Sequence, residues 1–168
     1  MRDDDRRTAF EALLREHRKI VLKVAAVYAR GVEDRRDLGQ EIALQLWRSF
    51  GSYQPERPFS TWMYRVALNV GISHARRERE RPQALDASLL DTLGGGSPID
   101  EPDERLRALA TAIDALGPLD RALMLLYLDE LPYAQIAAVL GIGESNVGTR
   151  IARLKQRLRR DMTEAASP

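Results

Sequence analysis

The chain has 168 residues, of which 44% are hydrophobic and 30% charged, and its formal net charge at pH 7 is +1. This length and composition are sufficient for one or two folded domains with packed cores. With no Cys and only two His, the sequence excludes a disulfide framework and a thiolate or clustered-histidine metal site. It contains no apolar run of transmembrane length and no signal-peptide pattern. We therefore expect a cytoplasmic protein without membrane insertion.

Charge is distributed unevenly along the chain. Residues 1–81 contain 17 basic and 12 acidic side chains, residues 82–103 contain 5 acidic side chains and no basic one, and residues 104–168 contain 9 basic and 8 acidic ones. The middle segment is also rich in Gly and Pro, which interrupt helices. Both flanking segments have helical periodicity and no strand pattern. The sequence thus predicts an all-α protein with two small helical domains, 1–81 and 104–168, joined by a flexible acidic linker, 82–103.

The first predicted element is one long helix that ends at Gly31. His17 belongs to its apolar stripe, and we interpret this histidine as a core or boundary residue rather than a catalytic one. The stripe repeats at helical spacing and consists of Phe10, Leu13, Leu14, His17, Val21, Val24, Ala25 and Tyr28.

The next predicted helix covers residues 35–50, RRDLGQEIALQLWRSF, and has two distinct faces. The predicted core face consists of Leu38, Ile42, Leu46, Trp47 and Phe50. A second face consists of Asp37, Gln40, Glu41, Leu44 and Arg48. Because Leu44 is apolar and its neighbours are polar, this face favours a protein-binding surface. Asp37 and Glu41 could contact an ion from successive turns, but without further ligands we predict no metal site.

Residues 51–81 begin as a Pro-containing loop and are expected to become helical near Ser60 or Thr61, both suitable N-cap residues. The side chains that can face the core are Trp62, Met63, Val66 and Val70. Another face carries Arg65, Asn69, Ile72 and Arg76, and Arg77 follows. Aromatic side chains beside a basic helix suit a nucleic acid whose bases are exposed for stacking. Taken singly, each of four aromatic residues here is better interpreted as a core residue: Tyr53, Phe59, Trp62 and Tyr64.

Residues 131–160 predict two helices with a tight Gly-containing turn between them, a helix-turn-helix. The first helix should end at Gly141, and its apolar stripe is Tyr133, Ile136, Ala137 and Leu140. The second should run over about 144–160, with a buried stripe of Val147, Ile151, Leu154 and Leu158. Gly148 is its one unfavourable residue, since Gly in a helix interior costs roughly 1 kcal/mol relative to Ala.

The side of the second helix opposite its apolar stripe favours DNA binding. This side carries Ser145, Thr149, Ala152, Arg153, Gln156 and Arg160. Residues 144–160 include six basic side chains and one acidic side chain. A basic amphipathic helix can simply be solvated, but a basic helix that follows a compact helix-turn unit is typical of proteins that insert it into a DNA major groove.

The order of these motifs resembles the extracytoplasmic-function (ECF, group IV) sigma factors of bacterial RNA polymerase. The resemblance spans residues 10–160 and rests on DLGQEIALQLW, on FSTWMYRVALN with the Arg cluster after it, and on LPYAQIAAVLGIGESNVGTRIARLKQRLR. It implies that residues 1–81 are sigma region 2 and residues 104–168 are sigma region 4. Such a chain directs RNA polymerase to promoters and helps to open them, without catalysis and without a cofactor.

The resemblance also implies roles for individual residues. Those that bind the clamp helices of the largest catalytic subunit are Asp37, Leu38, Gln40, Glu41 and Leu44. Those that bind the −10 element, beside a base-capturing loop at 52–58, are Tyr53, Trp62, Arg65, Asn69, Arg76 and Arg77. Those that bind the −35 element are Ser145, Asn146, Thr149, Arg150, Ala152, Arg153, Lys155 and Arg157. Arg150, Lys155 and Arg157 would contact phosphates.

Further expected partners are the flap region of the polymerase and promoter DNA, and an anti-sigma factor is left open. The alternative to a sigma factor is a stand-alone helix-turn-helix regulator with an N-terminal sensing or dimerisation domain. A small enzyme has no nucleophile–base pair, glycine-rich phosphate loop or metal cluster to support it.

Overall fold

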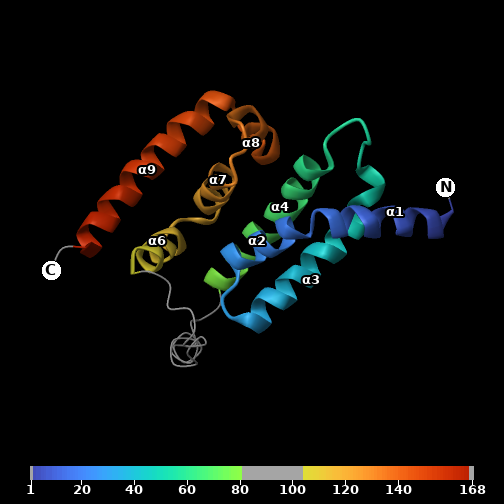
Figure 1. Ribbon diagram of the computed structural model, residues 1–168, viewed down its shortest axis with the longest axis horizontal. Helices are drawn as coiled ribbons and strands as arrows, with labels where there is room; N and C mark the ends of the chain where they lie inside the picture. The colour runs from blue at the N-terminus through green and yellow to red at the C-terminus, as the bar shows by residue number, and fades with distance from the viewer. Residues whose placement is uncertain (1, 81–103, 167–168) are drawn as a thin grey trace. The chain divides into compact units, whose positions relative to one another are not determined.

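The structure, a computed structural model, describes residues 2–80 and 104–166 (Figure 1). These residues form α-helices and one short 3₁₀ helix, and no strand occurs among them. The predicted all-α class is therefore confirmed. The predicted linker, 82–103, lies outside the described residues.

The chain divides into two compact units. The first is built on α1 (Asp3–Glu16), α2 (Arg18–Tyr28), α3 (Val32–Ser49), the 3₁₀ helix η1 (Phe50–Ser52) and α4 (Phe59–Glu80). The second is built on α6 (Glu104–Asp114), α7 (Pro118–Leu128) and α9 (Glu144–Ala166), with α8 (Tyr133–Leu140) between α7 and α9 along the chain.

The first predicted helix is in fact two helices. His17 separates α1 from α2, because its φ of −107° and ψ of 18° lie outside the helical region. The amide of Ile20 donates to the carbonyl oxygen of His17 at 3.0 Å, so the hydrogen-bond register restarts at this bend. The half-buried ring of His17 lies 5.3 Å from that of Phe59, at the edge of the core. The helix also ends earlier than predicted, at Tyr28, and Gly31 with φ 82° precedes α3 instead.

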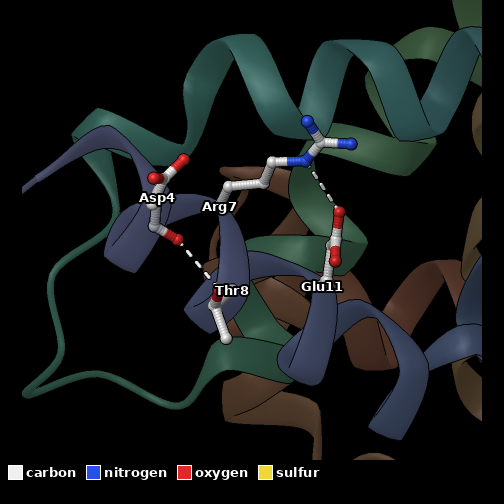
Figure 2. A network of polar contacts seen from close by, with 4 residues as sticks. All are labelled: Asp4, Arg7, Thr8 and Glu11. Carbon is white, nitrogen blue, oxygen red and sulfur yellow. Dashed lines mark hydrogen bonds and ion pairs between the residues drawn. The ribbon is translucent and has the colours of Figure 1, made fainter.

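Short-range polar contacts support the exposed side of α1 (Figure 2). Its first turn holds three aspartates, and their negative charges interact favourably with the positive end of the helix dipole. The hydroxyl of Thr8 donates to the carbonyl oxygen of Asp4 at 2.8 Å, and Nε of Arg7 donates to Oε1 of Glu11 at 2.9 Å. Because the Arg7 and Glu11 side chains are 72% and 51% exposed, their pairing contributes only about 0.3–0.5 kcal/mol.

The core of the first unit lies between α2, α3 and α4. Leu38, Ile42 and Leu46 of α3 are fully buried, as their spacing predicted, whereas Trp47 and Phe50 are only half-buried. On α4 the buried face differs from the predicted one, because Trp62, Val66 and Val70 are half-buried. The residues of α4 that fill the core are Phe59, Met63, Tyr64, Ala67, Leu68, Gly71 and Ala75. Several of these are small, which allows neighbouring helices to approach closely.

The core of the second unit forms where α9 packs on α6 and α7. The predicted stripe of α9 is confirmed, since Val147, Ile151, Leu154 and Leu158 are all buried. The helix continues past the predicted end at residue 160, to Ala166. The buried residues contributed by the other helices and connections are Ala112, Leu116, Ala122, Leu123, Met124, Leu126 and Ile136.

Helices α7 and α8 end in related left-handed caps. Gly141, the first residue after α8, has a φ of 70°. The amide of the next residue, Ile142, donates to the carbonyl oxygen of Ala137 at 3.2 Å. At the end of α7 the equivalent residue is Glu130, with φ 61°, and the amide of Leu131 donates to the carbonyl oxygen of Leu126 at 3.2 Å. This six-to-one hydrogen bond is the Schellman motif. It confirms that Gly141 stops the first helix of the helix-turn-helix.

Candidate nucleic-acid and protein interfaces

The polar face predicted on α3 is exposed in the structure. Asp37, Gln40 and Glu41 lie at the surface, and the side chain of Leu44 among them is 48% exposed. An exposed leucine at the centre of a polar helix face is a suitable anchor for a partner protein. Leu38 is expected from the sequence to bind the polymerase together with these residues, but its side chain is only 1% exposed and packs in the core. Its side chain therefore supports α3 from beneath and does not form part of this face.

Aromatic rings from α1, α3, η1, the following loop and α4, together with His17, form one connected group, the aromatic cluster. Ring centroids of neighbouring members lie 5.1–6.3 Å apart, mostly tilted or edge-on, the geometry that aromatic pairs prefer. The guanidinium of Arg6 covers one end of the cluster, 5.2 Å from the ring of Trp47. The cluster consists of Phe10, His17, Trp47, Phe50, Tyr53, Phe59 and Trp62.

Two residues predicted to bind the −10 element, Tyr53 and Trp62, are members of this cluster. Both are half-buried, and their ring centroids lie 5.5 Å apart. The hydroxyl of Tyr53 donates to the carbonyl oxygen of Arg57 at 3.0 Å, across the loop that precedes α4. These rings therefore already have packing partners within the protein.

The other residues predicted to bind the −10 element lie on the surface of α4. Arg65, Asn69 and Arg76 are all exposed. Their spacing of four and seven residues places them in one row along the helix. Within the described ranges no hydrogen bond joins the side-chain amide of Asn69 to another residue, so this amide is available to an external group. Arg77 is exposed in the last turn of α4, beside Arg79.

The exposed face of α9 combines short polar side chains with Arg153. Ser145, Asn146, Thr149, Ala152 and Arg153 are all exposed. The hydroxyl of Thr149 donates to the carbonyl oxygen of Ser145 at 3.0 Å, which keeps this side chain close to the helix. Within the part of the chain that the structure describes, Arg153 forms no ion pair. A small surface with one free guanidinium can enter a major groove and present two parallel donors to a base.

The other predicted phosphate contacts of α9 have partners in the same unit. Nη2 of Arg150 lies 3.5 Å from Oδ1 of Asp120 on α7. The ammonium of Lys155 lies 4.3 Å from the ring centre of Tyr127, also on α7. Arg157 is more exposed, with Nε 4.0 Å from Oδ2 of Asp161. A phosphate would compete with these partners for the first two cations.

Sequence periodicity alone does not identify Asp120 and Tyr127 as partners of the basic residues on α9. Neither belongs to a recognisable motif, and their contacts with Arg150 and Lys155 exist only because α7 packs on α9. The spacing of the basic residues along α9 predicts in part which of them can reach α7. Arg150 and Lys155 flank the buried stripe, whereas Arg153 lies further from it.

Family models match both units. Residues 13–81 match sigma-70 region 2, and residues 106–158 match sigma-70 region 4. The ECF RNA polymerase sigma-E factor of Escherichia coli is 30% identical over 148 residues, which cover 80% of this chain and 78% of that protein. The chain belongs to the ECF sigma factors. Members of this family direct RNA polymerase to promoters. A stand-alone regulator would have an N-terminal sensing or dimerisation domain, but residues 13–81 match sigma-70 region 2 instead.

A relative from Mycolicibacterium smegmatis, the ECF RNA polymerase sigma factor SigE, is 34% identical over 157 residues. This sigma factor spans 90% of its own length in that match but only 60% of SigE. The fold is that of a solved sigma factor, RpoE in complex with the anti-sigma factor NepR from Bartonella quintana. The likeness has a TM-score of 0.71 at 17% identity and covers 92% of this chain and 97% of that one.

The described residues were also compared with the requirements of a membrane-spanning helix and of a metal site. Across residues 2–80 and 104–166, no helix is both long and apolar enough to cross a membrane. The same residues contain no group of three His, Cys, Asp or Glu side chains placed to hold a metal ion.

Proposed function

We propose that this chain brings core RNA polymerase to specific promoters and helps to open them, with its two domains dividing the task. Residues 1–81 dock on the polymerase and hold the melted −10 element, residues 104–168 bind the −35 duplex, and residues 82–103 connect them. The observation that carries this proposal is the presence of regions 2 and 4, in that order, in one chain. A stand-alone regulator would need only the second.

The docking surface in this proposal is the exposed face of α3. Asp37, Gln40, Glu41 and Leu44 bind the clamp helices of the largest catalytic subunit. This role is supported by the exposure of all four side chains, including Leu44, which is 48% exposed between polar neighbours. An apolar side chain there becomes favourable once a partner removes it from water.

The −10 surface is the row on α4. Asn69 offers a donor and an acceptor to one base edge, and Arg65, Arg76 and Arg77 hold the phosphates of the melted strand. Trp62 lies beside this row as a half-buried member of the aromatic cluster. It contributes through the part of its side chain that remains exposed.

The −35 surface is the exposed face of α9. Arg153 reads one base pair, while Ser145, Asn146, Thr149 and Ala152 allow the helix to approach the groove. Arg150, Lys155 and Arg157 contact phosphates, and the first two do so by exchanging their partners on α7. This arrangement separates base reading from anchoring to the backbone.

The protein acts with further partners and without catalysis of its own. Region 4 contacts the flap region of the polymerase, and the protein acts in the cytoplasm without a cofactor. An anti-sigma factor is a further proposed partner, supported by the likeness to RpoE, which was solved with the anti-sigma factor NepR.

In vitro transcription tests the function directly. Core polymerase, the purified chain and fragmented genomic DNA are combined, and the transcript starts are mapped. We expect starts that require both proteins and share two upstream sequence elements. If no start depends on the chain while it binds fragments without polymerase, the chain is a stand-alone regulator and the proposal is wrong.

A further inference from the structure

Residues 53–58 form the loop between η1 and α4 (Figure 1). Hydrogen bonds between residues of this loop close it. The amide of Arg57 donates to the carbonyl oxygen of Gln54 at 3.0 Å, which forms a turn with Pro55 at its second position. Pro is favoured there because its φ is already suited to the turn. The hydroxyl of Tyr53 then donates to the carbonyl oxygen of Arg57 at 3.0 Å, so that one side chain spans the loop from its first residue.

The ring of Tyr53 is held in place by the aromatic cluster. Its centroid lies 5.1 Å from that of Phe59 and 5.5 Å from that of Trp62, both in the first turn of α4. On another side it stacks at 6.1 Å and 16° on Phe50 of η1. The amide of Tyr53 also donates to the carbonyl oxygen of Phe50 at 3.1 Å. Three neighbouring rings therefore fix the position of this ring, and one of its faces is already stacked on Phe50.

We infer that Tyr53 is a positioning residue, which sets the shape of the 53–58 loop and does not itself stack on a base. Its ring fixes the start of the loop against η1 and α4, and its hydroxyl fixes the carbonyl group of Arg57 near the end. The loop thus presents one backbone shape to the melted strand. This inference rests on the proposed function, in which the loop lies beside the −10 surface.

Removal of a single oxygen atom distinguishes the two roles of Tyr53. Tyr53→Phe keeps the ring and its packing but deletes the hydrogen bond to Arg57. If the ring stacked on a base, Phe would serve equally well and only Tyr53→Ala would impair function. If Tyr53 positions the loop, Tyr53→Phe already impairs it.

The first measurement is amide hydrogen exchange on the full chain, without polymerase or DNA. The Arg57 amide donates to Gln54 within the closed loop, so an exchange event requires the loop to open. Tyr53→Phe should make opening easier and speed exchange at this amide by roughly two- to tenfold, the change expected if the loop loses the stabilisation of one hydrogen bond. The matched control is Tyr127→Phe, which deletes a hydroxyl in the other unit and should leave this amide unchanged. Unchanged exchange in Tyr53→Phe would show that the hydroxyl does not close the loop, and the inference would be wrong.

The second measurement is transcription with core polymerase from a library randomised at the −10 element. We expect Tyr53→Phe to lower initiation on the preferred sequence by roughly two- to tenfold and to flatten the preference at one position. Faster exchange with a wild-type transcription profile would overturn the positioning role. Failure of the wild-type chain to start transcripts would instead overturn the proposed function, and the exchange measurement would still test the loop.

Discussion

The ring of Tyr28 lies against the backbone of Gly71, so closely that an added Cβ would stand 2.5 Å from the ring carbon Cδ2. Tyr28 is 5% exposed, and this contact lets α2 approach α4 over a residue without a side chain. We predict that Gly71→Ala lowers the free energy of unfolding by about 1–3 kcal/mol, as overpacking of a core does. Urea unfolding followed by circular dichroism measures this change.

Gly39→Ala is the matched control for that substitution. Gly39 also lies inside a helix of the first unit, but its added Cβ would meet Val21 Cγ1 at 3.8 Å, an ordinary contact. Helix propensity should therefore stabilise this variant by about 0.5–1 kcal/mol. Equal stability of the two variants would contradict the close packing of Tyr28 on Gly71.

The caps of α7 and α8 give a second pair of opposite predictions. Glu130 adopts a left-handed φ of 61° that strains a residue with a Cβ, whereas Gly141 adopts φ 70° without strain. Glu130→Gly should raise the free energy of unfolding by about 0.5–1 kcal/mol, the strain relieved less the entropy cost of glycine. Gly141→Ala should lower it by about 1 kcal/mol, and since no atom lies within 4 Å of the added Cβ, only backbone strain contributes. Thermal unfolding of both variants checks the signs.

Docking on the polymerase should depend on Leu44. Leu44→Arg places a charge at the centre of the exposed face of α3 and should abolish binding to core polymerase. Val32→Arg is the matched control, because Val32 is 77% exposed on the same helix but outside that face. Surface substitutions alter stability by about 0.5 kcal/mol or less, so both variants should remain folded. Co-purification with core polymerase decides, and retention of Leu44→Arg on core would refute the assignment.

Promoter melting should depend on Asn69. Asn69→Ala removes an exposed amide that forms no hydrogen bond within the described residues, so stability should change little. Open-complex formation should fall, and the preference at one −10 position should relax, because no other amide replaces the lost donor and acceptor. Permanganate footprinting reports the melting. Gln45→Ala, which removes the exposed amide that donates to Ser49 on α3, should leave the footprint intact.

Substitution of Arg153 and substitution of Arg157 should impair DNA binding in different ways. Arg153→Ala should lower −35 discrimination at one base pair by about 1–3 kcal/mol. Arg157→Ala should weaken binding to all sequences alike and reduce the salt dependence by about one charge. Transcription from a library randomised at the −35 element separates these outcomes. A wild-type sequence preference in Arg153→Ala would make Arg153 another phosphate contact.

Sequence periodicity predicts the helix-turn-helix well because its signals are local. The buried stripe of α9 consists of large aliphatic residues at regular spacing, and Gly141 supplies the left-handed turn. The break at His17 is invisible by the same method, because the apolar spacing continues across it. On α4, small residues such as Ala67 and Gly71 carry the core, whereas a search for large apolar side chains selects Trp62 and Val66.

The candidate interfaces show the same limit. Exposure of Leu44 and Arg153 follows from helical spacing alone, and the structure agrees. The placement of Leu38 required the packed helix, because a family motif does not separate a residue that supports a surface from one that forms it. The partners of Arg150 and Lys155 required the packing of α7 on α9, a long-range relationship without a local signal.

The aromatic cluster also determines what a fluorescence experiment on this protein reports. The chain has two tryptophans, and both of them, Trp47 and Trp62, are members of the cluster. The second unit contains none, so tryptophan emission follows the first unit alone, while the helical circular dichroism signal follows both. Comparison of the two signals in one urea titration therefore reveals whether region 2 and region 4 unfold as independent bodies. The protein carries its own domain-specific optical probe, with no label required.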